Sequence, residues 1–147
     1  MIRSRQLILL FALILFLAPG MPGTCALNNS EGAPNKGSKL LVVLTSGDRE
    51  VALKMVFMYT YNAKKNGWWD EVQLLVWGPS SRIIPGDDEM KEALKNMKEV
   101  GVQLTACKAC ANSYGVSEAL EKLGITVKYM GKPLTEMLKS EWTTITF

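Results

Sequence analysis

Histidine is absent from the 147-residue sequence, and cysteine occurs only three times. Without histidine the chain cannot hold a Ser-His or Cys-His catalytic pair or a histidine-ligated metal site. One of the three cysteines, Cys25, lies in a segment that we expect to be removed. The two that remain are too few for a four-cysteine zinc site within one chain. We therefore expect no metal site.

The sequence also lacks strong charge of one sign. It holds 17 basic and 14 acidic residues, a net charge of +3. Two of the basic residues, Arg3 and Arg5, lie in the segment that we expect to be removed, and without them the net charge is about +1. No block of Lys and Arg indicates nucleic-acid binding, and no glycine-rich phosphate-binding signature is present. We expect neither a nucleic-acid partner nor a cofactor.

The N-terminus has the layout of a secretory signal peptide over residues 1–26. Arg3 and Arg5 precede an apolar run over residues 7–18, and small residues follow at Thr24 and Ala26. The run is shorter than the roughly 20 apolar residues of a membrane span. We predict cleavage after Ala26, export to the periplasm or the cell exterior, and no stable membrane span afterwards.

Two alternatives concern this segment. In the first, the apolar run stays uncleaved and tethers the protein to a membrane. In the second, Cys25 becomes a lipidated first residue, but Pro22 and Thr24 fit that chemistry poorly.

A polar leader over residues 27–38 precedes one α/β domain over residues 39–147. The leader is rich in Asn, Gly and Ser. After it, strand and helix patterns alternate about four times, and a last strand follows, which is typical of a mostly parallel sheet. We predict strands at 40–44, 71–77, 102–106, 125–129 and 142–147, and helices at 50–66, 87–100, 116–123 and 133–139, with a loop at 80–86.

Methionines at helical spacing predict the buried faces of the first two helices. Met55 and Met58 lie in the first helix, and Met90 and Met97 lie in the second. We expect all four to pack in the core rather than to form a methionine metal site.

The most informative motif is the C-x-x-C of Cys107 and Cys110. It follows the third predicted strand and precedes a helical stretch, where free backbone N–H groups and the helix dipole favour a thiolate. Because strands of a parallel sheet end at one edge, the turns at residues 46–48 and 78–80 should lie at the same edge. Cys107 is interpreted either as a reactive thiol or as a small buried apolar residue. Cys110 either resolves a species formed on Cys107 or closes a permanent disulfide with it.

Four other residues could support this site. Lys108 could stabilise a thiolate, although a solvated lysine is the commoner outcome. Asn112 could offer a polar group to a sulfur anion, or could belong to an ordinary turn at a helix end. Ser46 and Gly47 could bind an anion at a helix N-terminus. The simpler role of this turn is to cap the helix through Ser46 or Asp48, as Asp87 or Asp88 would cap the next helix.

Residues 100–107, Val-Gly-Val-Gln-Leu-Thr-Ala-Cys, followed by Gly-Val at 115–116 and Gly-Ile at 124–125, resemble the DsrE/DsrF-like family. The opening strand and turn at 39–47 and the Tyr-Met-Gly at 129–131 are also similar. The resemblance implies a flavodoxin-like three-layer α/β/α fold with a five-stranded sheet. It implies homo-oligomers, trimers or hexamers, and a cysteine at the position of Cys107 that carries a persulfide between partner proteins. Cys110 is an addition to that single-cysteine pattern.

Two functions follow as hypotheses. In the first, the exported protein handles sulfane sulfur or disulfides, with Cys107 as the persulfide carrier and Cys110 as its resolving partner. Such a protein would be a sulfur transferase or carrier, or a thiol-disulfide oxidoreductase, and a sulfur donor or acceptor protein would be its partner. The alternative is a non-catalytic oligomeric binding module with a structural Cys107–Cys110 disulfide.

Overall fold

The computed structural model describes residues 37–147. The predicted signal peptide and nearly all of the predicted leader therefore lie outside the described residues. The strands are β1 (Lys39–Leu44), β2 (Glu71–Val76), β3 (Gln103–Cys107), β4 (Thr126–Lys128) and β5 (Trp142–Thr146). The helices are η1 (Val51–Phe57), α1 (Met58–Lys65), α2 (Ser80–Ile83), α3 (Asp88–Glu99), α4 (Lys108–Ser113), α5 (Ser117–Lys122) and α6 (Gly131–Leu138). None of these helices is long and apolar enough to cross a membrane.

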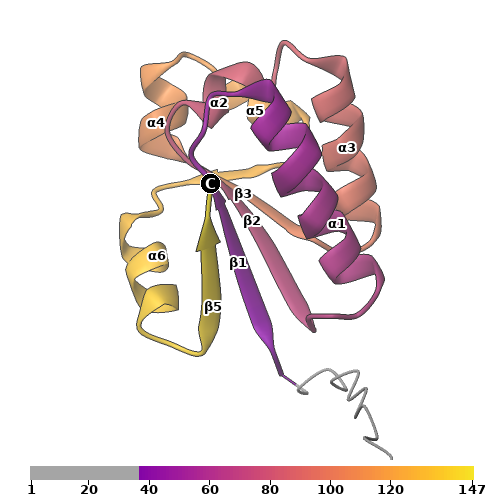
Figure 1. Cartoon of the computed structure of the whole chain (residues 1–147). Helices are drawn as coiled ribbons and strands as arrows, with labels where there is room; N and C mark the ends of the chain where they lie inside the picture. The colour runs from indigo at the N-terminus through magenta and orange to yellow at the C-terminus, as the bar shows by residue number, and fades with distance from the viewer. Residues whose placement is uncertain (1–36) are drawn as a thin grey trace, which may run out of the picture. The chain divides into compact units, whose positions relative to one another are not determined.

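All five strands are parallel, in the order β4-β3-β2-β1-β5. Parallel crossovers are right-handed, so helices that link strands added in one direction cover one face of the sheet. The last connection runs back past β1, and its helix α6 lies on the opposite face (Figure 1). The predicted α/β fold, with a parallel five-stranded sheet between helices, is confirmed.

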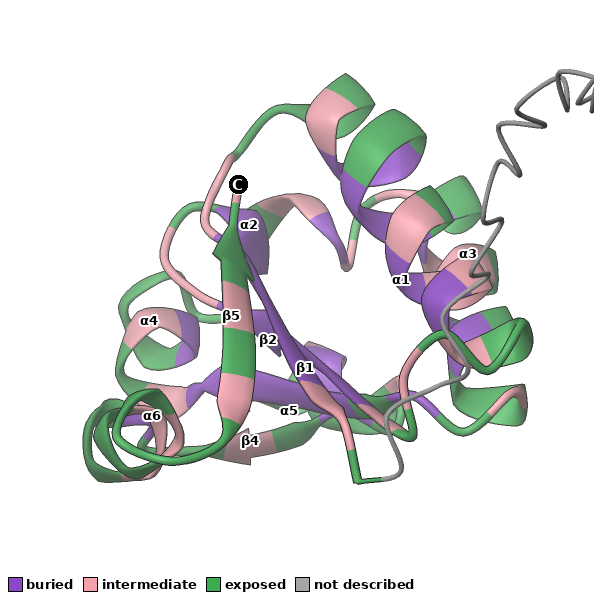
Figure 2. Ribbon diagram, turned by 60° about the horizontal axis from the view of Figure 1, so that its bottom comes forward, coloured by how far each residue is buried: buried purple, intermediate pink, exposed green. Residues whose placement is uncertain are grey.

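The larger core lies between the sheet and the helices η1, α1, α3 and α5. The strands β1 and β2 are buried on both faces because their apolar runs are nearly continuous (Figure 2). Leu40, Val42 and Leu74 face this core and meet Leu94 and Met97 from α3. Each fully buried side chain of this size stabilises the fold by about 1.5–3 kcal/mol relative to exposure.

The smaller core lies under α6 and contains Cys107. It consists of Leu41, Val43, Leu75, Cys107 and Met130, all of them buried. Leu134 and Met137 of α6 pack against it from above. The strands β4 and β5 at the two edges of the sheet are only partly covered (Figure 2). Cys107 is therefore placed by packing as well as by its position at the end of a strand.

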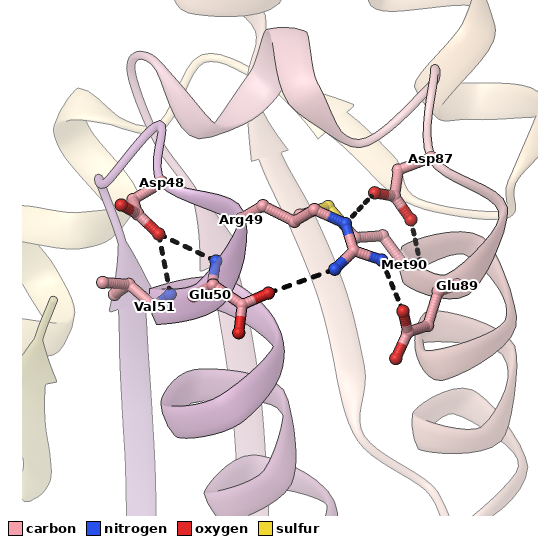
Figure 3. A network of polar contacts seen from close by, with 7 residues as sticks. All are labelled: Asp48, Arg49, Glu50, Val51, Asp87, Glu89 and Met90. Carbon is pink, nitrogen blue, oxygen red and sulfur yellow. Dashed lines mark hydrogen bonds and ion pairs between the residues drawn. The ribbon is translucent and has the colours of Figure 1, made fainter.

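Carboxylates fix the first turns of η1 and α3, as predicted (Figure 3). Asp48 Oδ1 accepts hydrogen bonds from the backbone N–H groups of Glu50 and Val51, at 2.8 and 3.1 Å. Asp87 is the N-cap of α3, and its Oδ1 accepts from the Met90 N–H at 3.0 Å. Each cap satisfies N–H groups that have no partner within the helix.

Arg49 joins the starts of these two helices (Figure 3). Its Nε donates to Asp87 Oδ2 at 2.6 Å, and its Nη2 pairs with Glu89. The hydrogen bonds that Arg49 donates to these two carboxylates raise its pKa further above the ordinary value. The contact holds the loop after β1 against the loop before α3.

Three predictions about local structure differ from what is observed. Met55 and Met58 are 51% and 58% exposed, so the prediction that they lie in the core is wrong. The first helix begins with the π-helical segment η1, whose wider turn changes which side chains face the sheet. Its buried residues are Ala52, Leu53, Val56 and Phe57. Met90 and Met97 are buried as predicted.

The other two differences are short helices. The predicted loop at 80–86 contains the four-residue helix α2, and the helical stretch expected after the C-x-x-C is divided into α4, which begins directly after Cys107, and α5. Single helical turns of this length carry too little periodicity to be predicted from apolar spacing.

Candidate functional site

Cys107 is the last residue of β3 and the N-cap of α4. Its side chain faces α6 in the smaller core and is 5% exposed. Its backbone is still extended, with φ −73° and ψ 114°, so the chain turns into the helix directly after the thiol. The sulfur therefore lies beside the free N–H groups of the first helical turn.

The surroundings of Cys107 favour its thiolate. Burial alone raises the pKa of this thiol, but the Cys110 N–H, the Cys110 thiol and the N–H groups of Met130 and Ala109 outweigh burial. These N–H groups approach the sulfur without completing a regular N-cap hydrogen bond. The net result is a pKa below that of an ordinary cysteine, because the donors stabilise the charged form.

Cys110 has the opposite tendency. Burial raises the pKa of its thiol, the hydrogen bond to Cys107 and the charge of that thiolate raise it further, and the Gly78 N–H only partly compensates. Both cysteines are free thiols, with Cys107 buried and Cys110 half-buried. The first proton therefore leaves Cys107, while Cys110 stays protonated as its donor.

This arrangement provides a nucleophile and a neighbouring thiol. A thiolate attacks sulfur in disulfides, persulfides and polysulfides, and a second thiol one helical turn away can attack the product. Within residues 37–147, no group of three or more Cys, Asp or Glu side chains is placed to hold a metal ion. The two thiols have the spacing that sulfur exchange requires.

Two basic side chains each lie over a tyrosine ring, and each pair has one member in α4 or directly after it. The Lys108 ammonium lies 5.8 Å from the centre of the Tyr129 ring. The Arg82 guanidinium lies 5.9 Å from the centre of the Tyr114 ring. Both tyrosines are exposed. Lys108 is therefore held over an aromatic ring rather than against a sulfur.

Asn112 has a structural contact. Its Oδ1 accepts a hydrogen bond from Ser117 Oγ at 2.6 Å, which ties the end of α4 to the start of α5. Asn112 therefore has the second of its two expected roles, that of a residue in an ordinary turn at a helix end. Asn112 belongs to α4, as do Lys108 and Cys110, but its acceptor is directed to α5.

Ser46 and Gly47 lie at the same sheet edge, after β1. The Ser46 N–H donates to the Phe147 carbonyl oxygen at 3.1 Å, and Ser46 Oγ accepts from the Asp48 N–H at 3.1 Å. A Cβ on Gly47 would lie 3.3 Å from Pro79 Cβ, so glycine permits the close approach of the Pro79 turn. The expected meeting of the turns at 46–48 and 78–80 is observed.

Sequence reasoning missed two contributors to the site. Met130 packs in the same core as Cys107, and its backbone N–H lowers the pKa of Cys107. The backbone N–H of Gly78 lowers the pKa of Cys110. Both follow a strand end, Gly78 after β2 and Met130 after β4. Their position after a strand end could have indicated them. Their role could not be predicted from residue type, because every residue except proline has a backbone N–H.

A family model described as the DsrE/DsrF-like family matches residues 38–147. Among solved structures, a conserved protein of unknown function from Bacteroides thetaiotaomicron is 32% identical, with a TM-score of 0.73. That alignment covers 78% of this chain and 99% of that protein. No curated protein matches the chain.

A second solved structure is more distant. The ychN protein from E. coli aligns with a TM-score of 0.59 at 13% identity, over 75% of this chain and 99% of that one. At this identity the likeness concerns the fold alone. It agrees with the parallel five-stranded sheet described above.

Proposed function

The chain belongs to the DsrE/DsrF-like family, and we propose that it accepts sulfane sulfur on Cys107 and releases it with the help of Cys110. Membership of this family indicates a sulfur-relay-like protein. The assignment of the two cysteines rests on one observation, the opposite pKa shifts of two neighbouring thiols. A lowered pKa gives Cys107 a larger thiolate fraction than an ordinary cysteine has, while the raised pKa of Cys110 keeps its proton for the next step.

In the first step, the Cys107 thiolate attacks the sulfane sulfur of a persulfide or polysulfide donor. The S–S bond of the donor breaks, its electron pair leaves with the donor as a thiolate or shorter polysulfide, and a persulfide forms on Cys107. No net oxidation occurs, because one S–S bond replaces another.

Cys110 provides one route for release. Its thiol attacks Cys107 Sγ, a Cys107–Cys110 disulfide forms, and the outer sulfur leaves as sulfide with both electrons of the cleaved bond. An external dithiol then reduces the disulfide and restores both thiols. Residues three apart on one helical turn are close enough for this bond. Alternatively, an acceptor thiolate takes the outer sulfur directly and leaves Cys107 reduced.

Cyanide tests the proposal because it removes sulfane sulfur as thiocyanate. The protein is loaded with polysulfide, freed of excess reagent and treated with cyanide. Wild type treated at once should yield up to one thiocyanate per chain, because Cys110 can expel part of the sulfur as sulfide beforehand, and Cys107→Ser should yield none. Cys110→Ser should accept sulfur but hold it longer, because it lacks the resolving thiol. Equal yields from wild type and Cys107→Ser would refute the proposal.

The alternative, a binding module with a structural disulfide, predicts different behaviour. Its Cys107–Cys110 bond would have a reduction potential far below that of the cellular thiol pool. Replacing Cys107 with Ser would then change stability and no thiol reaction.

We further propose that the mature protein is exported, with Ala26 at the cleavage site, and that it forms a homo-oligomer. The support is the N-terminal sequence pattern for export, and the family resemblance for assembly into trimers or hexamers. Intact mass of the protein from its native host reports the cleavage site and the fate of Cys25. Analytical ultracentrifugation of the mature chain reports the size of the assembly.

A further inference from the structure

An open hollow lies against β3 and β4. Its volume is about 330 Å³, and its lining includes polar side chains from β2, β3 and β4 and one lysine from the end of α3. The polar and basic members are Gln73, Gln103, Thr105, Thr126, Lys128 and Lys98. We call this hollow the β3–β4 trough.

The floor of the trough is unusual for a parallel sheet, whose faces are normally apolar. Gln73 and Thr105 are 2% and 6% exposed, yet both are polar. Gln73 Nε2 donates to Thr105 Oγ1 at 2.9 Å, and Thr105 Oγ1 donates to the Leu74 carbonyl oxygen at 3.2 Å. Burying such groups is costly unless they are hydrogen-bonded, and here they are held in fixed positions beside an open space.

The charge of the trough is positive. Lys98 and Lys128 are its only charged lining residues, and no carboxylate lines it. Among residues 37–147, the ion pairs involve other lysines and leave these two without a carboxylate partner. Gly124 makes room for Lys98, whose Nζ lies where a Cβ of that residue would be. Two ammonium groups beside amide and hydroxyl groups suit an oxoanion.

Cys107 does not line the trough, but strand register places it next to Lys128, which does. Lys128 pairs with Cys107 across β3 and β4, so the two Cα atoms lie about 4.8 Å apart, and paired side chains of parallel strands share a face. Thr105 lies two residues before Cys107 on the same strand and therefore on the same face. An anion bound at Lys128 would therefore lie beside the strand position that carries the Cys107 thiol.

We propose that the β3–β4 trough binds the oxoanion group of a small sulfur donor, of which thiosulfate is the simplest. This inference rests on the proposed function and adds the class of substrate. The Cys107 thiolate attacks the sulfane sulfur, the bond between the two sulfurs of thiosulfate breaks, and sulfite leaves with its electron pair. The lysines hold the sulfonate oxygens in the ground state and neutralise the charge of the leaving sulfite.

Binding is tested separately from chemistry. Sulfate carries the same oxoanion but no sulfane sulfur, and it is titrated calorimetrically at constant ionic strength into Cys107→Ser, where no sulfur transfer occurs. We expect saturable binding of one sulfate, and Lys98→Gln and Lys128→Gln added to this background should each weaken it about tenfold. Lys95→Gln is the matched control because Lys95 lies on α3, pairs with Glu92 and does not line the trough. No binding, or equal weakening by all three changes, would overturn the proposal.

Sulfur loading of Cys107 forms the second arm. Lys128→Gln should slow loading from thiosulfate about tenfold and leave loading from inorganic polysulfide unchanged, because polysulfide has no sulfonate group. Equal slowing with both donors would overturn the trough assignment. Loading from polysulfide without sulfate binding would refute the trough and leave the proposed function intact. Sulfate binding without loading from either donor would refute the proposed function instead.

Discussion

The thiols of Cys107 and Cys110, one helical turn apart, shift each other's pKa in opposite directions: that of Cys107 is lowered and that of Cys110 is raised. The two cysteines of one motif therefore have different chemical roles. A C-x-x-C spacing alone does not distinguish the two sulfurs. The junction of β3 and α4 does, because Cys107 lies at the N-cap of α4, where the N–H groups of Ala109 and Cys110 lower its pKa.

Alkylation of the thiols should report this asymmetry. In wild type, the rate of iodoacetamide modification at Cys107 should rise with pH and reach half its maximum below the ordinary cysteine value of about 8.5. The depressed pKa means that the thiolate is present above that midpoint and lost below it. Cys110→Ala removes a donor and should move the midpoint upward.

The matched variant for this experiment is Cys107→Ser, in which only Cys110 can react within the described domain. Its modification should be slower at neutral pH, because burial raises the pKa of Cys110. If Cys110 reacts faster than Cys107, the two roles are reversed.

The floor of the trough offers a stability test. Thr105→Val should lower the free energy of unfolding by about 1–3 kcal/mol, because Gln73 Nε2 loses its buried acceptor. Gln73→Leu combined with Thr105→Val should recover part of the loss, since no unpaired polar group then remains. Urea denaturation of the single and double variants measures the coupling. A fully additive result would show that the pair does not interact.

Gly124→Ala should affect both the fold and the trough. Gly124 has a φ of +76°, which costs other residues about 1–2 kcal/mol, and a methyl group would displace the Lys98 ammonium. We expect a lower melting temperature and weaker sulfate binding. Gly67→Ala, at a φ of +67° with open space around it, is the control: it should lower stability without changing sulfate affinity.

The N-cap of α3 gives a pH-dependent prediction. The Met90 N–H and the Arg49 side chain lower the pKa of Asp87. A depressed carboxyl pKa contributes stability above the unfolded value of about 3.9, and this contribution is lost as the pH falls through the folded value. Asp87→Asn should therefore lower the melting temperature by a few degrees at pH 7, with the difference shrinking below about pH 4.

The control for that experiment is Asp88→Asn. Asp88 is exposed and pairs only with Lys91 of the same helix, an arrangement that contributes little. A similar loss in both variants would mean that general surface charge, not the cap, sets the pH dependence.

Much of the fold could be predicted because its signals are local. The apolar runs of β1 and β2, the caps at Asp48 and Asp87, and the strand end at Cys107 all followed from neighbouring residues. Met55 and Met58 were placed wrongly because a π-helical turn rotates the buried face without any change in apolar content.

The rest of the site depended on contacts between distant segments. The N–H groups of Gly78 and Met130 reach the thiols from the ends of β2 and β4. Lys128 meets Cys107 through strand register, which a sequence pattern without the sheet order does not give. The structure therefore adds two things to the C-x-x-C motif: the order of the strands, which brings Lys128 beside Cys107, and the backbone N–H groups that act on the two thiols.

The most direct test of sulfur acceptance at Cys107 is peptide-resolved mass spectrometry after brief exposure of the reduced protein to polysulfide. We predict one added sulfur atom on the peptide that carries Cys107 and Cys110 in wild type and in Cys110→Ser, removable by dithiothreitol, and none in Cys107→Ser. Addition that persists in Cys107→Ser, or no addition in Cys110→Ser, would contradict the assignment of Cys107 as the sulfur acceptor.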